Sequence, residues 1–341
     1  MNDMTDLKPL TPDDFTSDQE VRWCPGCGDY AILKCMQRTL PALGARPENT
    51  VFISGIGCSS RFPYYMATYG FHTIHGRAPA VATGLKLANP DLDVWVITGD
   101  GDALSIGGNH TMHAIRRNVD LNILLFNNEI YGLTKGQYSP TSRVGTRSPS
   151  TPFGSVDRPV SACGFALGSN GRFVARTIDT AQKHMPEVFA RAYQHKGASF
   201  VEIFQNCIVY NDGVWAPFTE KPVAADTQLL LEHGKPMIFG KNKDKGLRLN
   251  RDSLHLEVVT VGVDGVSLDD VLVHDETNKA VAQMLVEMPF GPFPVALGVL
   301  YCDPAPTFES AVIAQARDVA AKRGAADFDK LLRDGQTWTV R

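Results

Sequence analysis

The sequence Gly-Asp-Gly-Asp-Ala at residues 99–103 is followed along the chain by Asn-Asn-Glu at residues 127–129, and these two motifs decide the fold. Each comes directly after a short apolar run, residues 94–97 and residues 122–126, with the length and β-branched content of a buried strand. Residues 106–117 between them have the length of a crossover helix. This pattern predicts a βαβ unit with both polar motifs at the carboxyl ends of strands, where open parallel sheets bind ligands.

The side chains of the two motifs have complementary chemistry. Gly99 and Gly101 allow a tight turn that brings backbone N–H groups close to a phosphate. Asp100 offers a carboxylate, Asn128 an amide oxygen and Ile130 a backbone carbonyl, a set that suits Mg²⁺ bound together with a diphosphate. An ordinary Asp-Gly turn beside an Asn-rich loop is the alternative, and the strand-end position of both motifs favours the diphosphate site.

The two motifs resemble the diphosphate-binding motif of thiamine diphosphate enzymes, in which the first Asp and the last Asn bind Mg²⁺. The continuation Tyr-Gly-Leu-Thr-Lys-Gly-Gln-Tyr-Ser-Pro-Thr at residues 131–141 is similar to the β subunits of the 2-oxoacid:ferredoxin oxidoreductases. The resemblance implies an α/β thiamine diphosphate-binding fold, a mostly parallel sheet flanked by helices with a C-terminal extension. It also implies that Mg²⁺ is bound by Asp100, Asn128 and the carbonyl of Ile130.

The same resemblance implies a set of contacts to thiamine diphosphate. His75 precedes the start of a helix at residue 78, where an anion is favoured, although a lone histidine in such a place is more often structural. The other implied contacts are Gly57, Cys58, Gly99, Gly101, Asp102, Ala103, Asn128, Tyr131, Gly132, Leu133 and Thr134.

Length and composition set the outer limits. The 341 residues carry a net charge of −4, with 43% hydrophobic and 21% charged residues, as in a soluble protein with a large core and no general affinity for nucleic acid. No apolar run approaches the roughly 18 residues of a membrane span, and the polar N-terminus does not resemble a signal peptide. We expect a cytoplasmic protein with an arm at residues 1–19, a cofactor domain at residues 20–215 and an extension at residues 216–341.

The seven cysteines are not expected to form structural disulfides. Cys24 and Cys27 form a Cys-x-x-Cys pair before a predicted helix at residues 30–40, and a redox dithiol, half of a zinc site or two cluster ligands are all open. Cys58 and Cys207 each follow a predicted strand, which favours a cluster. The resemblance implies that these four cysteines hold one [4Fe–4S] cluster, whereas Cys35, Cys163 and Cys302 are expected to be buried and apolar.

The remaining segments give weaker indications. A helix is expected over residues 179–195, capped by Asp179 or Thr180, and an amphipathic helix over residues 308–322. Arg143 and Arg147 are expected to face solvent in a loop, with contacts to phosphates as the alternative. The basic residues 241–251 are expected to form a solvated loop, with docking of ferredoxin or coenzyme A as the alternative, and Leu331, Leu332 and Trp338 are expected to pack on a partner.

The resemblance implies a reaction, the oxidative decarboxylation of a 2-oxoacid with coenzyme A and reduction of ferredoxin. No second α/β half is recognisable that would supply the glutamate for the thiamine pyrimidine, so an α subunit is expected, in an αβ or (αβ)₂ assembly. Arg61 is expected to bind a distal substrate carboxylate, which favours 2-oxoglutarate over pyruvate, although a surface arginine is the alternative. A non-redox thiamine enzyme and a zinc-stabilised scaffold are the competing functions.

Overall fold

The computed structural model describes residues 9–335 and 337–340, and its centre is an eight-stranded sheet in the order β2-β1-β3-β4-β8-β7-β13-β9. Neighbouring strands run parallel except for β13, which is antiparallel to β7. This confirms the expected mostly parallel sheet. The strands are β1 (Thr50–Ser54), β2 (Tyr69–His72), β3 (Asp93–Gly99), β4 (Asn122–Asn127), β7 (Phe173–Ile178), β8 (Ser199–Phe204), β9 (Gln228–Leu230) and β13 (Val295–Cys302).

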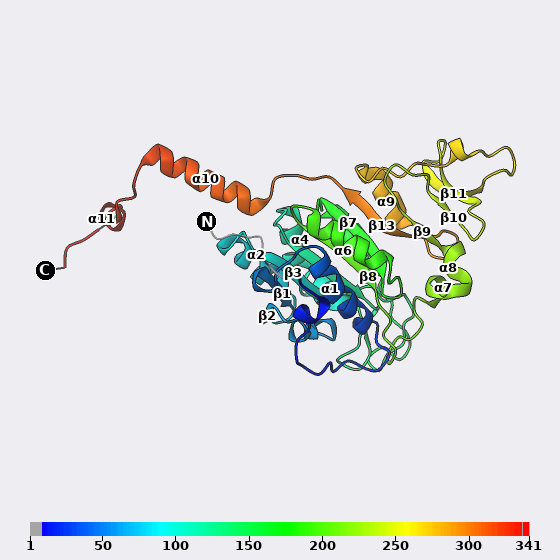
Figure 1. Cartoon of the computed structure of the whole chain (residues 1–341), viewed down its shortest axis with the longest axis horizontal. Coiled ribbons are helices and arrows are strands. Elements are labelled where there is room, and N and C mark those ends of the chain that lie inside the picture. The colour runs from blue at the N-terminus through cyan, green and yellow to red at the C-terminus, as the bar shows by residue number, and fades with distance from the viewer. Residues whose placement is uncertain (1–8, 336, 341) are drawn as a thin grey trace.

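Helices cover both faces of this sheet (Figure 1). Along β4, Ile123 and Leu125 pack in one apolar cluster with α2, α4, α5 and α9, whereas Leu124 and Phe126 pack in a second cluster with α1 and α6. A strand that is buried on both faces is apolar along its whole length, which explains its continuous apolar run. The helices are α1 (Asp29–Ala42), α2 (Ala78–Ala88), α3 (Asp100–Leu104), α4 (Gly108–Arg116), α5 (Ala162–Gly168), α6 (His184–Gln194) and α9 (Lys279–Glu287).

Two predicted helices begin later than expected. The crossover helix expected over residues 106–117 is α4, which starts at Gly108, and a short helix that was not predicted, α3, precedes it from Asp100 at the end of β3. Helix α6 starts at His184, and the prediction that Asp179 or Thr180 caps it is wrong. The carboxylate of Asp179 instead accepts a hydrogen bond from the backbone N–H of Asn206 (2.8 Å), which ties the segments after β7 and β8 together.

The chain after residue 215 continues into the main sheet, because β9 and β13 are two of its strands. Residues 241–251 do not form the expected loop: they contain β11 (Lys245–Asn250), which pairs antiparallel with β12 (His255–Thr260) and β10 (Ile238–Phe239). Other short elements are η2 (Pro12–Phe15), η3 (Pro47–Asn49), η4 (Ser59–Tyr65), β5 (Ile130–Tyr131), β6 (Gln137–Tyr138), α7 (Ala216–Thr219), α8 (Lys221–Thr227) and η5 (Leu268–Asp270).

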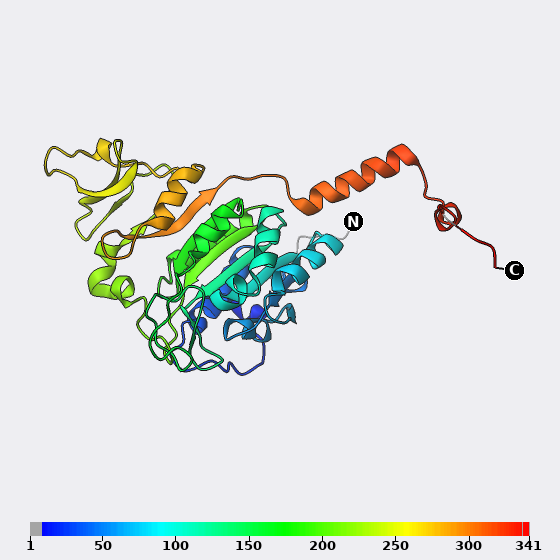
Figure 2. The ribbon, with the colours of Figure 1, turned by 180° about the vertical axis from the view of Figure 1, so that it is seen from behind.

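The C-terminal arm consists of α10 (Phe308–Arg323) and α11 (Phe328–Leu332), and both views show it projecting away from the body (Figures 1 and 2). Its base is held where the Asn118 side chain donates to the carbonyls of Ala305 (3.1 Å) and Pro306 (3.2 Å). The helix expected over residues 308–322 is therefore present as α10, but beyond its first turn it has no apolar face buried against the rest of the described chain. No helix in the described residues has the length and apolar character needed to cross a membrane.

Candidate active site

A pocket of about 220 Å³ lies at the carboxyl edge of the sheet, where β1, β3 and β4 end side by side. Almost every residue implied for the cofactor lines it: Gly57, Cys58, His75, Gly99, Asp100, Gly101, Asp102, Asn128, Ile130, Tyr131, Gly132, Leu133 and Thr134. Ala103 does not line this pocket, because it is buried in the apolar cluster beneath α3, and its prediction as a contact is not supported by its position. Asp29, Ile56, Ser59, Phe126 and Gln205 complete the lining.

Asp100 occupies the centre of this edge with a carboxylate that is almost entirely removed from solvent, at 2% exposure. Its Oδ2 accepts hydrogen bonds from the hydroxyls of Ser139 (2.5 Å) and Thr141 (2.6 Å), but within the described chain it forms no ion pair. Burial raises the pKa of Asp100 to about 6 in spite of these bonds. A buried carboxylate that lacks a positive partner is a fitting ligand for a divalent cation.

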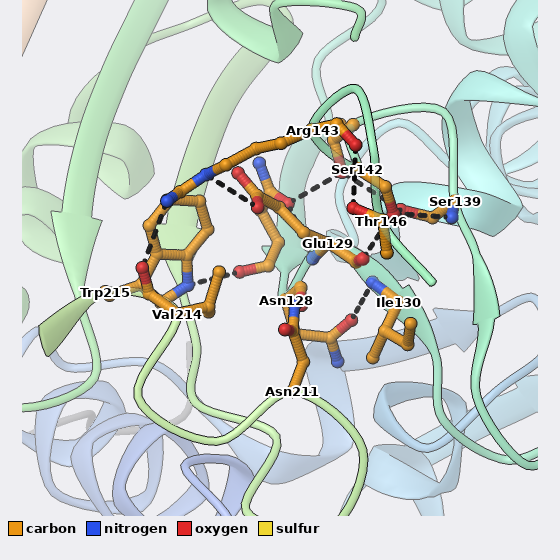
Figure 3. Close-up of polar contacts among 12 residues, drawn as sticks. Asn128, Glu129, Ile130, Ser139, Ser142, Arg143, Thr146, Asn211, Val214 and Trp215 are labelled. Carbon is orange, nitrogen blue, oxygen red and sulfur yellow. Dashed lines mark hydrogen bonds and ion pairs between the residues drawn. The ribbon is translucent and has the colours of Figure 1, made fainter. Parts of the chain in front are cut away.

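Asn128 presents its amide beside Asp100 in a fixed orientation. Its Nδ2 donates to Oε1 of Gln205 (2.8 Å), and its Oδ1 accepts from the backbone N–H of Ile130 (3.2 Å). The carbonyl of Asn128 accepts from the side chain of Asn211 (2.8 Å), and both residues are drawn with Glu129 and Ile130 in Figure 3. An amide oxygen accepts at two positions, so one remains for a cation, and the donor set fits Mg²⁺.

Asp102 lines the pocket, and both oxygens of its carboxylate accept hydrogen bonds from other residues of the chain. It accepts from the backbone N–H of Gly76 (2.6 Å) and from the hydroxyl of Thr98 (2.9 Å). A Cβ at Gly55 would lie 1.8 Å from its Oδ2, so this close approach requires glycine. Asp102 therefore joins the end of β3 to the turns that carry Gly55 and His75, and it is placed to position those turns.

Gly101 is in close contact with the side chain of Tyr131, which leaves no room for a Cβ. A Cβ on this residue would lie 2.1 Å from the ring of Tyr131, whose hydroxyl donates to the carbonyl of Gly101 (3.1 Å). The second glycine of the first motif is thus required by packing against the segment that follows the second motif. This contact fixes the distance between the two motifs across the pocket.

The four implied cluster cysteines line one cavity of about 190 Å³ that adjoins the pocket and shares Cys58, Asn128, Gly132, Leu133 and Gln205 with it. A Cβ at Gly132 would lie 3.4 Å from Sγ of Cys207 and 3.8 Å from Sγ of Cys58, so these two sulfurs flank that glycine. Burial raises the pKa of Cys58 to about 12 and that of Cys27 still higher. Among the described residues, no three His, Cys, Asp or Glu side chains are grouped to hold a metal ion.

Three comparisons with known proteins place the chain. Residues 55–203 match the family model for the C-terminal thiamine pyrophosphate-binding domain of thiamine pyrophosphate enzymes. The 2-oxoglutarate oxidoreductase subunit KorB of Mycobacterium tuberculosis is 50% identical over 338 residues, which cover 98% of this chain and 89% of that protein. The β subunit of 2-oxoacid:ferredoxin oxidoreductase 1 of Aeropyrum pernix is 46% identical over 196 residues, which cover 58% of this chain and 62% of that protein.

This chain belongs to the β subunits of the 2-oxoacid:ferredoxin oxidoreductases. A solved structure agrees, that of a 2-oxoglutarate:ferredoxin oxidoreductase from Magnetococcus marinus with 2-oxoglutarate, coenzyme A and succinyl-CoA bound. It matches with a TM-score of 0.77 and 32% identity, covering 98% of each chain. The resemblance inferred from the sequence is therefore confirmed, and with it the thiamine diphosphate-binding fold.

Arg61 of this oxidoreductase subunit lies beside the cofactor pocket rather than in its lining. Its Nη1 donates to the carbonyl of Arg22 (3.0 Å), and both arginines line a wide groove with His72. The groove and the cofactor pocket share Ile56, Gly57 and Leu133. Arg61 also lines the cysteine cavity, so it lies next to the cofactor pocket, between the groove and that cavity.

Two site residues of the β subunit were missed by the sequence analysis. Asp29 is 1% exposed, and burial raises its pKa to about 7, although the neighbouring Cys27 thiol opposes the shift. Glu129 is buried and forms an ion pair with Arg143 (3.1 Å), and burial raises the pKa of Glu129 to about 7 while Arg143 opposes the shift. The expectation that Arg143 faces only solvent is therefore wrong.

The pKa of Asp100 leads to a pH-dependent prediction. Because the folded pKa of about 6 exceeds the ordinary 3.8, the folded protein loses stability as pH rises from 3.8 to 6. In the metal-free subunit, Asp100→Asn should therefore raise the melting temperature above pH 6 and leave it unchanged below 3.8. The variant should also lose Mg²⁺-dependent binding of thiamine diphosphate, and wild-type binding should weaken as pH falls through about 6. A lower melting temperature at pH 8 would contradict this.

Proposed function

We propose that this subunit takes part in the coenzyme A-dependent oxidative decarboxylation of 2-oxoglutarate, which gives succinyl-CoA and CO₂ and reduces ferredoxin, and which is reversible. The observation that carries the proposal is the cofactor pocket, in which Asp100, Asn128 and Ile130 meet beside a cavity lined by four cysteines. The 2-oxoglutarate named for the Mycobacterium tuberculosis and Magnetococcus marinus proteins supports the choice of substrate.

In the proposed site, Asp100, Asn128 and the carbonyl of Ile130 bind Mg²⁺, which orients the diphosphate of the cofactor. Thiamine diphosphate supplies the carbanion that adds to the keto carbon and the electron sink for loss of CO₂. The chain contributes the surroundings of this chemistry: Asp102 holds the turn with His75 in place, and the ring of Tyr131 packs against Gly101.

We propose that Cys24, Cys27, Cys58 and Cys207 hold one [4Fe–4S] cluster. Decarboxylation of one 2-oxoglutarate releases two electrons, and two ferredoxin molecules each accept one, while the coenzyme A thiol gives up its proton as the thioester forms. A cluster beside the pocket passes electrons singly, which suits this stoichiometry. The shared lining of the cysteine cavity and the cofactor pocket supports a short path between the two groups.

We propose that an α subunit completes the active site by supplying the glutamate for the thiamine pyrimidine, in an αβ or (αβ)₂ assembly. The described residues form one large α/β sheet, and the matched family model covers the diphosphate-binding half. Within residues 216–341, we propose that the C-terminal arm makes the most extensive contact with the α subunit. It carries exposed Phe328, Leu331, Leu332 and Trp338 on a projection that its own body does not cover (Figure 2).

The arm proposal predicts the effect of a deletion. Removing residues 311–341 spares β13, the contacts of Asn118 and the buried side chain of Glu309, so the shortened chain should fold with an unchanged melting temperature. Its recovery with a tagged α subunit after co-expression should fall sharply relative to the full-length chain, measured as the β-to-α ratio in size-exclusion chromatography. An unchanged ratio would show that the arm does not hold the α subunit.

The cluster proposal predicts a pattern among the cysteines. Replacing Cys24, Cys27, Cys58 or Cys207 singly by Ala should lower the iron and sulfide content and abolish electron transfer to ferredoxin. Cys163→Ala and Cys302→Ala are the matched controls, since both thiols are buried away from the cavity, and neither should change the iron content. Full iron occupancy in a Cys58→Ala, Cys207→Ala double variant would overturn the assignment.

The substrate proposal is tested with the co-expressed α and β chains in a viologen reduction assay, with the β chain alone as an inactive control. The complete enzyme should prefer 2-oxoglutarate to pyruvate, because Arg61 next to the cofactor pocket is placed to bind a distal carboxylate with two hydrogen bonds. Arg61→Ala should lower kcat/KM for 2-oxoglutarate by about 10–100-fold, the size of one lost charged contact.

The loss on an uncharged 2-oxoacid should be much smaller for the same variant. Equal losses of kcat/KM on both substrates would show that Arg61 does not bind the distal carboxylate. A wild-type preference for pyruvate would instead favour the alternative, a pyruvate or broad-specificity enzyme, and decarboxylation without viologen reduction would favour a non-redox thiamine enzyme.

A further inference from the structure

The turn between the two proposed metal ligands has an unusual backbone. Glu129 lies between Asn128 and Ile130 with a φ of 54°, in the left-handed region that a residue with a long side chain rarely adopts. Such a conformation persists when its surroundings hold it in place. The turn also decides where the Asn128 amide and the Ile130 carbonyl point, so whatever holds Glu129 also sets the metal ligands.

The backbone N–H of Glu129 donates to Oδ1 of Asn127 (3.3 Å), and its carbonyl and carboxylate are bound by one segment, residues 139–143, which we call the clasp. The hydroxyl of Ser142 donates to the carbonyl of Glu129, and Nε of Arg143 donates to its carboxylate (3.1 Å). The backbone N–H of Ser139 in turn donates to Oγ of Ser142 (2.8 Å). Figure 3 shows Ser142 and Arg143 reaching the turn from the same side, with the carboxylate of Glu129 facing the guanidinium.

The clasp also contacts the third proposed ligand. The hydroxyls of Ser139 and Thr141 both donate to Oδ2 of Asp100, and Thr141 additionally donates to Oδ1 of Asn127 (3.0 Å). One short segment therefore touches the ends of β3 and β4 at the same time. It does so from outside the pocket, because none of its residues lines it.

Arg143 anchors the clasp to the chain that follows β8. Its Nη2 donates to the carbonyl of Val214 (3.0 Å), and its guanidinium lies over the rings of Trp215 (5.6 Å) and Phe290 (5.8 Å). Trp215 donates from Nε1 to the carbonyl of Asn127 (3.1 Å), next to the turn. Arg143 thus connects Glu129 to Val214, Trp215 and Phe290, which do not line the cofactor pocket.

We propose that the Glu129–Arg143 ion pair is a positioning device that holds Asn128 and Ile130 in the geometry for Mg²⁺ and diphosphate. The inference rests on the proposed function of this pocket. Neither residue contacts the metal: the pair acts through the backbone of the turn, as outer groups that orient metal ligands do. Its loss should weaken assembly of the cofactor site far more than the chemistry in a site that has been assembled.

The test compares Arg143→Ala with Arg147→Ala, a change of an exposed arginine in the same loop. Binding of thiamine diphosphate to the co-expressed, cofactor-free enzyme is measured by equilibrium dialysis as a function of Mg²⁺ concentration. Arg143→Ala should raise the half-saturating Mg²⁺ concentration by about 10–100-fold, as loss of outer-shell partners does elsewhere, while Arg147→Ala matches the wild type. At saturating Mg²⁺ and cofactor, kcat of Arg143→Ala should remain close to wild type.

Three further variants keep the result interpretable if Arg143→Ala fails to fold. Arg143→Lys retains a charge but not the fork that reaches Glu129 and Val214 together, so it should shift the Mg²⁺ dependence partway. Glu129→Gln retains an oxygen for Nε and should shift it less than Glu129→Ala. Normal Mg²⁺ dependence in Arg143→Lys and Glu129→Ala would refute the positioning role. Failure of the wild type to bind thiamine diphosphate with Mg²⁺ would instead refute the proposed function.

Discussion

A buried carboxylate without a positive partner is the feature on which this site depends. Asp100 is placed at the start of α3 by the end of β3, and only hydroxyl donors satisfy it within the described chain. The desolvation that raises its pKa also makes the metal-free site costly, because the charged form is held in a place where water cannot solvate it. Binding of a divalent cation would relieve that cost, which is the physical reason for proposing Asp100 as a metal ligand.

The geometry around Asp100 follows from the parallel sheet. Since β1, β3 and β4 are neighbours and run in the same direction, the segments that leave them meet at one edge. Glycines at positions 55 and 101 let these segments approach within distances that a Cβ would forbid. The pocket is therefore closely packed at its base by Asp102 and Tyr131, while it remains open toward Arg61 and the cysteine cavity.

Two other parts of the chain, the clasp and the C-terminal arm, relate to the site in different ways. Arg143 of the clasp at residues 139–143 contacts Val214 and Trp215, so the loop after β6 and the segment after β8 together stabilise the turn at residues 128–130. The arm of α10 and α11 leaves the body with its apolar side chains exposed, which is the arrangement expected of a subunit that works in an assembly.

The sequence by itself determined the βαβ unit, most of the pocket lining and the family. Apolar runs that end in polar motifs are local patterns, and the parallel sheet brings the ends of such strands together without further information. The tertiary structure decided what the local pattern does not contain. The formation of α3 before α4, the entry of β13 into the main sheet and the burial of Asp29 depend on which segments pack together. The pairing of Glu129 with Arg143 could not be predicted from the sequence. An arginine in a polar loop is expected to be solvated, and only the folded chain buries Glu129 and brings its carboxylate within 3.1 Å of Nε of Arg143.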